Sequence, residues 1–237
     1  RDRARLARTV HPLLATRGVP GTHDIGLLAR TLADLAHASP QQPARIPRFD
    51  KGRDTRLPPS RWRRIAEPPR LVLLEGWCVG VPAQAAAALA RPLNALERDE
   101  DRDALWRRWV NAQLGGAYAT LWRHLDGLIL LQAPDFAVVK RWRGETEHAL
   151  RVHAAHRAMD AAALRRFLMH YERLSRQALR TLPARADIRI VLGQNRDVCA
   201  IVSTRTRTRY LPAKTHDAAA VAGVSLAARR SRRAASR

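Results

Sequence analysis

Residues 48–56 combine acids and bases on a segment that is expected to be a loop. Asp50 and Asp54 stand there among four cations, two of which are Lys51 and Arg56. Such cations can hold a small anionic substrate while an acid orients its hydroxyl group. A solvated charged loop is the alternative, since most charged runs are simply exposed. The residues alone leave both interpretations open.

A second candidate is the triplet Thr22-His23-Asp24, which offers a hydroxyl, an imidazole and a carboxylate directly after Gly21. These groups suit substrate binding or proton transfer. Asp24 also precedes Ile25 and further apolar residues at helical spacing, where an aspartate commonly caps a helix. The triplet therefore predicts either a working site or a helix cap with a surface histidine.

The third candidate is Glu75, which directly follows the apolar run Leu71-Val-Leu-Leu74. This run predicts a buried strand, and ligands of open parallel sheets bind at the carboxyl ends of strands. Four aliphatic residues followed by an acid are also typical of a Walker-B strand, whose carboxylate holds Mg²⁺ or its water. A strand end without a function is an equally good interpretation of so short a pattern.

Strands that alternate with helices have to position these residues. Besides 71–74, apolar runs predict strands at 128–131 and 188–192, and helical patterns are centred on 100–124 and 160–181. This alternation is typical of βαβ units. We therefore expect an α/β fold with a mostly parallel sheet flanked by helices.

The remaining segments are simpler. Residues 3–15 predict a short helix, and a second helix should begin after Asp24. Residues 38–70 contain seven prolines and few periodic apolar positions, which predicts a long loop region. Loops of this length inside a compact domain are often functional.

The charge is unevenly distributed. The chain has 43 Lys and Arg against 21 Asp and Glu, a formal net charge of +22, which by itself suggests a polyanionic partner. Residues 204–237 hold eight Arg, one Lys and one Asp, and therefore +8 of this excess. We expect a single α/β domain over 1–203 and a basic, disordered tail over 204–237.

Several classes of protein are excluded. No apolar run approaches the roughly 18–20 residues that span a bilayer, so we expect no membrane partner and a cytoplasmic location. Cys78 and Cys199 form no Cys-x-x-Cys pair, which argues against a disulfide scaffold and redox chemistry.

A phosphate-binding loop is also absent from these 237 residues. Its motif, Gly-x-x-x-x-Gly-Lys-Ser/Thr, would have to end at Lys214-Thr215, where Thr208 and Ala213 occupy the glycine positions. The chain begins at Arg1, inside a segment patterned as a helix, so we expect sequence to precede it.

Seven segments within residues 1–192 together carry a resemblance to one family. They are Val10–Asp24, Phe49–Lys51 with Asp54 and Arg56, Leu73–Gly80, Pro92–Asn94 with Glu97, Ala133–Phe136, Trp142-Arg143 with Glu145 and Glu147, and His170–Arg173. Their order resembles that in D-glycerate 3-kinase and its bacterial kinase-like relatives, which are P-loop kinases of small hydroxyl substrates.

The resemblance implies an ATP-dependent kinase, assisted by Mg²⁺, that transfers the γ-phosphate to a small hydroxy acid such as D-glycerate. Acids for Mg²⁺ and arginines for phosphate suit this reaction, which depends mainly on positioning and on charge neutralisation. The implied roles are catalysis by Glu75, Asp50 and Lys51, Mg²⁺ binding by Glu75, substrate binding by His23, Asp24, Asp54 and Arg56, and a lid over the nucleotide phosphates at Arg143.

The chain departs from the family pattern. Members have a first strand, a Walker-A loop and an Asp-Asp-Phe-Tyr segment upstream of the position of Arg1, so we expect these 237 residues to lack kinase activity by themselves. Thr146 and Thr55 stand where relatives usually have Gln and an acid. The rival hypothesis is a non-catalytic, basic nucleic-acid-binding protein, which the family resemblance makes the weaker of the two.

Overall fold

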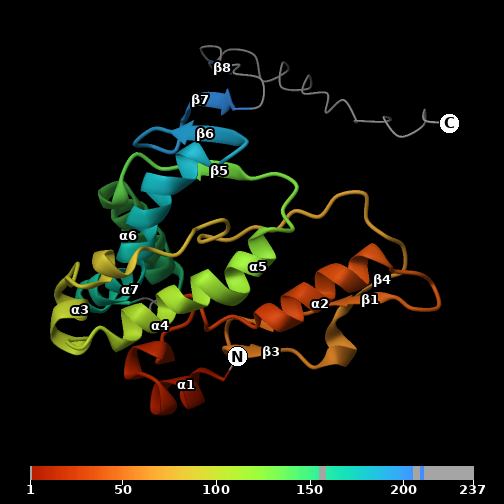
Figure 1. The fold of residues 1–237 in the computed structure, drawn as a ribbon, viewed down its shortest axis with the longest axis horizontal. Coiled ribbons are helices and arrows are strands. Elements are labelled where there is room, and N and C mark those ends of the chain that lie inside the picture. The colour runs from red at the N-terminus through yellow and green to blue at the C-terminus, as the bar shows by residue number, and fades with distance from the viewer. Residues whose placement is uncertain (1, 155–158, 205–208, 211–237) are drawn as a thin grey trace.

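The computed structural model of the chain describes residues 2–154, 159–204 and 209–210. A group of helices lies beneath a small sheet, and one helix with two short hairpins projects to the side (Figure 1). The helices are α1 Arg3–Thr9, α2 Ile25–Ala36, α3 Ala95–Glu100, α4 Leu105–Gln113, α5 Ala119–Trp122, α6 Phe136–Ala154 and α7 Ala161–Thr181. Shorter helical turns are η1 Pro12–Ala15, η2 Pro59–Arg61, η3 Ala86–Leu89, the π-helical η4 Leu114–Tyr118 and η6 Leu182–Ala184.

The main sheet has four strands in the order β5-β6-β7-β8. They are β5 Ile129–Gln132, β6 Ile188–Leu192, β7 Val198–Ser203 and β8 Arg209–Tyr210. β5 and β6 pair in parallel, whereas β7 and β8 each pair antiparallel to their neighbour. The α/β class is thus confirmed, but the described sheet is parallel only at β5–β6. The reason is that residues 193–197 join β6 to β7, and so short a turn can connect only antiparallel neighbours.

The predicted strand over residues 71–74 is wrong. The segment 71–76 has no secondary structure, and the side chains of Leu71 and Leu73 are 71% and 80% exposed. A strand needs a neighbouring chain to take up its backbone hydrogen bonds, and none of the described strands pairs with this segment. Glu75 therefore follows an exposed segment without secondary structure instead of a buried strand.

The other expected elements correspond closely to observed ones. The pattern around 160–181 is α7, and the pattern around 100–124 contains α4, η4 and α5. Residues 3–15 form two helical pieces, because Pro12 has no backbone N–H to continue α1. The loop region 38–70 contains two short hairpins, whose strands are β1 Ala44–Ile46 with β4 Arg63–Ile65, and β2 Phe49–Asp50 with β3 Thr55–Arg56.

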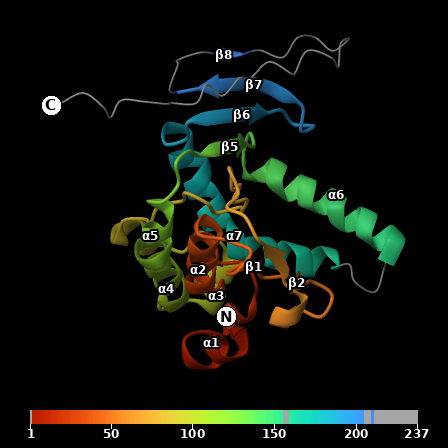
Figure 2. The same ribbon diagram turned by 90° about the vertical axis from the view of Figure 1, so that its right-hand side faces the viewer.

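The main core lies where α1, η1, α4, η4 and α7 meet. Its fully buried side chains include Leu14, Leu114 and Tyr118. The sheet covers one end of α7, and α6 extends away from the body beside it (Figure 2). α2 packs its own small cluster against the β1–β4 hairpin, through Leu35, Ala38 and Ala44.

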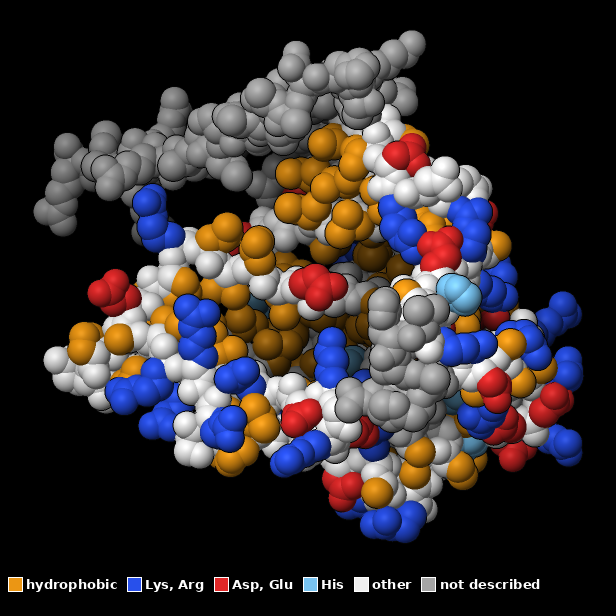
Figure 3. Space-filling view, turned by 180° about the vertical axis from the view of Figure 1, so that it is seen from behind, with side chains coloured by type: hydrophobic (Ala, Val, Ile, Leu, Met, Phe, Trp, Pro, Cys, Tyr) orange, Lys and Arg blue, Asp and Glu red, His pale blue; other side chains and the backbone are white. Residues whose placement is uncertain are grey.

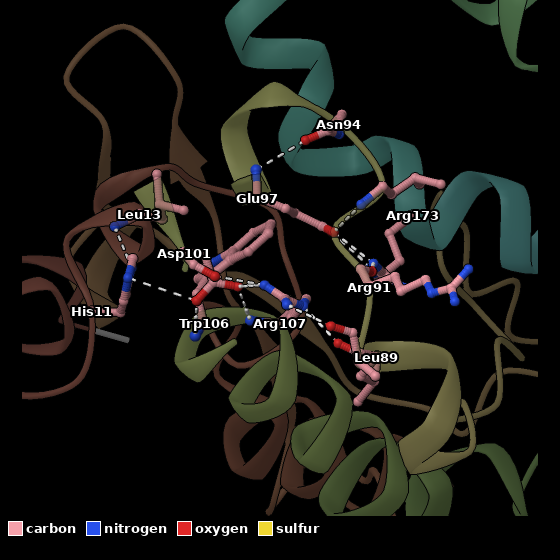
Figure 4. A network of polar contacts seen from close by, with 12 residues as sticks. His11, Leu13, Leu89, Arg91, Asn94, Glu97, Asp101, Trp106, Arg107 and Arg173 are labelled. Carbon is pink, nitrogen blue, oxygen red and sulfur yellow. Dashed lines mark hydrogen bonds and ion pairs between the residues drawn. The ribbon is translucent and has the colours of Figure 1, made fainter. Parts of the chain in front are cut away.

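Two buried arginines hold the segment 88–91 in place (Figure 4). Arg173 donates to the backbone carbonyls of residues 88 and 91, at 2.8 and 2.9 Å, and Arg107 donates to those of residues 89 and 90, at 2.8 and 3.4 Å. Glu97 pairs with Arg173 at 2.5 Å, and Asp101 pairs with Arg107 at 2.9 Å. Each charge is therefore neutralised, and four consecutive carbonyls find donors inside the protein.

Most of the predicted basic tail, 204–237, lies outside the described residues. Thr204 follows β7, and Arg209–Tyr210 forms β8. The two-part division at residue 203 stays a prediction. In the part of the chain that the structure describes, no helix combines the length and apolar character needed to cross a membrane.

Candidate functional site

A tight turn at Gly21 presents His23 and Asp24 at the beginning of α2. Gly21 has a φ of +92°, which favours glycine. A Cβ atom there would lie 2.3 Å from the ring of Trp109, so no larger residue fits without a shift. Thr22 closes the turn, because its hydroxyl donates to the carbonyl of Val19 at 2.7 Å.

Asp24 has two tasks. Its Oδ1 accepts from the backbone N–H of Leu27 at 3.1 Å, which confirms the expected helix cap. Its Oδ2 accepts from Arg56 at 2.8 Å, so β3 is tied to the beginning of α2. Burial raises the pKa of Asp24, but the hydrogen bonds from Arg56 and Leu27 outweigh it and hold the pKa below the ordinary 3.8. Asp24 is ionised at neutral pH.

Asp54 sits between two arginines from the amino-terminal part of the chain. Arg3 and Arg17 both pair with its carboxylate, Arg17 at 2.5 Å. Burial raises the pKa of Asp54, but the hydrogen bonds and charges of Arg3 and Arg17 together outweigh it and hold the pKa below the ordinary 3.8. The hairpin 49–56 is thereby linked to α1 and to the loop before Gly21.

Asp50 and Lys51 lie at the tip of the same hairpin. Asp50 Oδ1 accepts from the backbone N–H groups of Gly52 and Arg53, at 2.9 and 3.1 Å, and so shapes the turn. The Lys51 side chain is exposed and makes no hydrogen bond or ion pair with any described residue. The carboxylate is fixed in place, and the ammonium group is free to move.

Glu75 is exposed and, among the described residues, has no hydrogen-bond or ion-pair partner. Its segment is nevertheless attached to the Gly21 turn, because the indole N–H of Trp77 donates to the carbonyl of Gly18 at 2.9 Å. Glu75, the Gly21 turn and the hairpin 49–56 are thus connected parts of one region, although no direct contact joins Glu75 to Asp50 or Lys51.

Tyr171 connects this region to Arg143, and sequence reasoning gave it no role. Its hydroxyl donates to the carbonyl of Arg17, and its ring lies 5.1 Å from that of Trp77 and 4.8 Å from that of Phe167. Arg143 stacks over Phe167 at 5.7 Å. Burial raises the pKa of Tyr171 to about 12, so the hydroxyl remains a neutral donor. Its position within the segment His170–Arg173 was the only available signal.

Arg143, on α6, is the expected lid residue. It pairs with the buried carboxylate of Glu147 one turn later, and its Nε atom is buried without a hydrogen-bond partner. The segment 193–197 fastens the same helix, since the indole of Trp142 donates to the carbonyl of Gln194 at 2.9 Å and Arg196 pairs with Glu145 at 2.6 Å.

The predicted residues therefore fall into two groups. Asp24, Asp54 and Arg56 gather with Arg3 and Arg17, and their guanidinium groups outnumber the carboxylates. Glu75, Asp50, Lys51 and Arg143 make no direct polar contact with one another. No three described His, Cys, Asp or Glu side chains are grouped to hold a metal ion.

One face of the molecule has a hollow that is lined by hydrophobic side chains. Charged side chains surround this hollow (Figure 3).

A cavity in the described structure lies elsewhere. It has a volume of about 360 Å³ and is lined by Gly80, Trp122, Leu128 and Asp187, among others. None of the predicted site residues lines it. Two of its lining residues, Leu128 and Asp187, directly precede β5 and β6, so the cavity lies at the amino ends of these strands. Open parallel sheets bind their ligands at the opposite, carboxyl ends.

No protein-family model matches the chain, but two known proteins that resemble it in sequence are named as kinases. The chain is 30% identical over 167 residues to a Schizosaccharomyces pombe protein named uncharacterized kinase mug58, an alignment that covers 68% of this chain and 58% of that protein. It is 29% identical over 147 residues to the chloroplastic D-glycerate 3-kinase of Arabidopsis thaliana, covering 59% of this chain and 29% of that enzyme. The chain thus spans less than two thirds of either relative.

Solved structures show the same fold. A D-glycerate 3-kinase from Cryptococcus neoformans matches 85% of this chain and 74% of its own, with a TM-score of 0.68 and 24% identity. The YGR205w protein matches 90% of this chain and 74% of its own, with a TM-score of 0.61 and 23% identity. At these identities the likeness extends to the fold alone.

Proposed function

We propose that this chain, which is similar to a D-glycerate 3-kinase and to an uncharacterized kinase, serves the ATP-dependent phosphorylation of a small hydroxy acid, with D-glycerate as the substrate. The observation that carries the proposal is the cluster of Arg3, Arg17 and Arg56 around two ionised aspartates. A hydroxy acid needs a cation for its carboxylate and an acceptor for its hydroxyl group, and this cluster offers both.

Each predicted residue has a place in this scheme. Arg56, held by Asp24, would bind the substrate carboxylate, with His23 and Asp54 beside it. Asp50 would face the reacting hydroxyl group from a turn that fixes its carboxylate, and Lys51 would reach the transferred phosphoryl group on a mobile side chain. Arg143 would approach the nucleotide phosphates from α6.

Mg²⁺ fits the exposed carboxylate of Glu75. Magnesium in kinases is commonly held by one or two carboxylates together with substrate phosphates, so a cluster of three protein ligands is not required. When bound, the ion would neutralise charge on the phosphates. A binding site for the phosphates of ATP is not evident among these residues, because the 237 residues contain no P-loop motif.

Substrate binding can be measured without ATP. We expect the 237-residue protein to bind D-glycerate in isothermal titration calorimetry and to bind glycerol, which lacks the carboxylate, far more weakly. Arg56→Met should weaken D-glycerate binding about 10- to 100-fold, because a charge-assisted hydrogen bond contributes roughly 1.5–3 kcal/mol.

Arg61→Met is the matched control, since Arg61 is exposed and forms no ion pair with a described residue. It should leave the affinity unchanged. Equal binding of D-glycerate and glycerol, or equal losses in the two variants, would contradict the proposed substrate site.

Turnover is a separate expectation. We expect the same protein to show no phosphorylation of D-glycerate above background when ATP and Mg²⁺ are supplied, because these residues contain no loop of backbone N–H groups with a lysine for the β- and γ-phosphates. A coupled assay for ADP tests this. Sustained, D-glycerate-dependent release of ADP by this protein would show that its other cations replace the P-loop.

A further inference from the structure

The imidazole of His23 contacts a residue that no sequence motif singled out. We propose that Tyr118 is a positioning residue which fixes His23 as a neutral imidazole with its proton on Nε2, directed toward the substrate. The role toward the substrate rests on the proposed function. The hydrogen-bond arrangement itself can be tested without a ligand.

Tyr118 is held firmly by the unusual helix in which it lies. It ends the π-helical segment η4, where Gly116 departs from helical geometry with φ −98° and ψ −112°. Its side chain is 2% exposed, and its ring packs edge-to-face on Trp122, with ring centres 5.8 Å apart. π-Helical bulges are frequent at functional sites, since they change the direction of the following side chains. The hydroxyl group of Tyr118 therefore has a defined position.

Two hydrogen bonds connect this hydroxyl group to the turn before α2. Its oxygen accepts from the backbone N–H of Gly21 at 2.9 Å, and it lies 2.7 Å from Nδ1 of His23. Because this oxygen has a second lone pair, the hydroxyl group could either donate to Nδ1 or accept from it, and the proposal is that it donates. A neutral imidazole whose Nδ1 accepts carries its proton on Nε2.

The other nitrogen of His23 is available. Among the described residues, no hydrogen bond reaches Nε2. Since this atom is also absent from the buried polar atoms that lack a partner, it is accessible to solvent. It can therefore donate to a substrate oxygen. In this state it cannot accept the proton of a substrate hydroxyl group, so His23 would bind and orient the substrate, and an aspartate would act as the base.

His170 provides an internal reference with the opposite arrangement. Its Nδ1 lies 3.0 Å from the carbonyl oxygen of Arg166, which can only accept, so Nδ1 carries the proton. Its Nε2 lies 3.1 Å from the hydroxyl group of Thr16. Burial lowers the pKa of both histidines below 6.5, and both are neutral at pH 7. Two neutral histidines of opposite tautomer are therefore expected in one spectrum.

The charged groups near His23 are few. Asp24 follows it in the chain and is paired with Arg56, and burial is the main cause of the lowered pKa of His23. Tyr118→Phe removes one oxygen atom and alters none of these charges. Their contributions therefore cancel when the variant is compared with the unchanged protein.

The test is a pH titration of ¹⁵N-labelled protein by NMR, which reports the tautomer and pKa of each histidine. We expect the Nε2–H pattern for His23, and a rise of its pKa toward 6.5 in Tyr118→Phe, because a donor to the neutral nitrogen is lost. The signals of His170 should stay unchanged, which also shows that the variant is folded. An Nδ1–H pattern for His23, or a pKa that falls or does not move in Tyr118→Phe, would overturn the proposal.

A second comparison addresses the substrate. In His23→Gln the side-chain amide N–H reaches the region of Nε2, whereas in His23→Asn it reaches that of Nδ1. We expect the Gln variant to bind D-glycerate within about threefold of the unchanged protein and the Asn variant to lose about tenfold or more. Equal losses in both would refute the donor role. If the unchanged protein binds no D-glycerate, the proposed substrate fails, and the titration still decides the role of Tyr118.

Discussion

Replacing Arg173 with methionine is expected to lower the free energy of unfolding by about 3–5 kcal/mol. The side chain is buried and serves three groups at once, namely the Glu97 carboxylate and the carbonyls of residues 88 and 91. Methionine fills much of the volume but leaves Glu97, which is 0% exposed, as an uncompensated buried charge. Chemical denaturation followed by circular dichroism measures the loss.

Arg166→Met is the matched control on the same helix. Arg166 pairs with Glu100, but both side chains are about half exposed, at 50% and 42%. Exposed ion pairs contribute only about 0–1 kcal/mol, since water solvates the separated charges almost as well. A similar loss in both variants would show that the buried network around residues 88–91 contributes no more than a surface pair.

Gly21→Ala is expected to destabilise the protein by about 2–5 kcal/mol. A left-handed backbone costs a residue with a Cβ atom about 1–2 kcal/mol, and overpacking costs typically about 1–3 kcal/mol. Both apply here, because φ is +92° and the new atom would lie 2.3 Å from the Trp109 ring. Any shift that relieves the clash also moves the N–H that donates to Tyr118, so D-glycerate binding should fall as well.

Gly144→Ala is the control, for which we expect a change of stability in the opposite direction. Gly144 lies within α6, and a Cβ atom there would meet no atom within 4 Å. Alanine should therefore stabilise the protein by about 0.5–1 kcal/mol, through its better helix propensity. If Gly21→Ala were also neutral or stabilising, the packing of Trp109 against the turn would not be as tight as the structure has it.

The local elements were within reach of sequence reasoning. Asp24 caps α2 because a carboxylate before an apolar helical pattern finds the free N–H groups of the first turn, within three residues. β6 covers residues 188–192 as expected, and α7 begins within one residue of its pattern. Such features depend on interactions between near neighbours in the chain, which composition and spacing encode directly.

The strand expected at residues 71–74 does not form in the described structure. Apolar character indicates that a segment can join a sheet, but hydrogen bonds with a second chain segment decide whether it does. In the described structure these residues have no secondary structure and are mostly exposed, and Glu75 is exposed with them. The antiparallel pairing of β7 with β6 likewise follows from the short connection at 193–197 and not from the apolar pattern of either strand.

The sequence by itself determined the α/β class, the cap of α2 and which acids and cations are candidates for a substrate site. Only the tertiary structure decided how they are combined. Asp24 meets Arg56 across 32 positions, and His23 meets Tyr118 across 95. The sequence carried no functional signal for Tyr118, because an aromatic residue on a helical pattern predicts only core packing, and none for Tyr171 beyond its place in the segment His170–Arg173. Their hydroxyl groups acquire a role when folding brings a distant turn within hydrogen-bond distance, and no local pattern encodes that encounter.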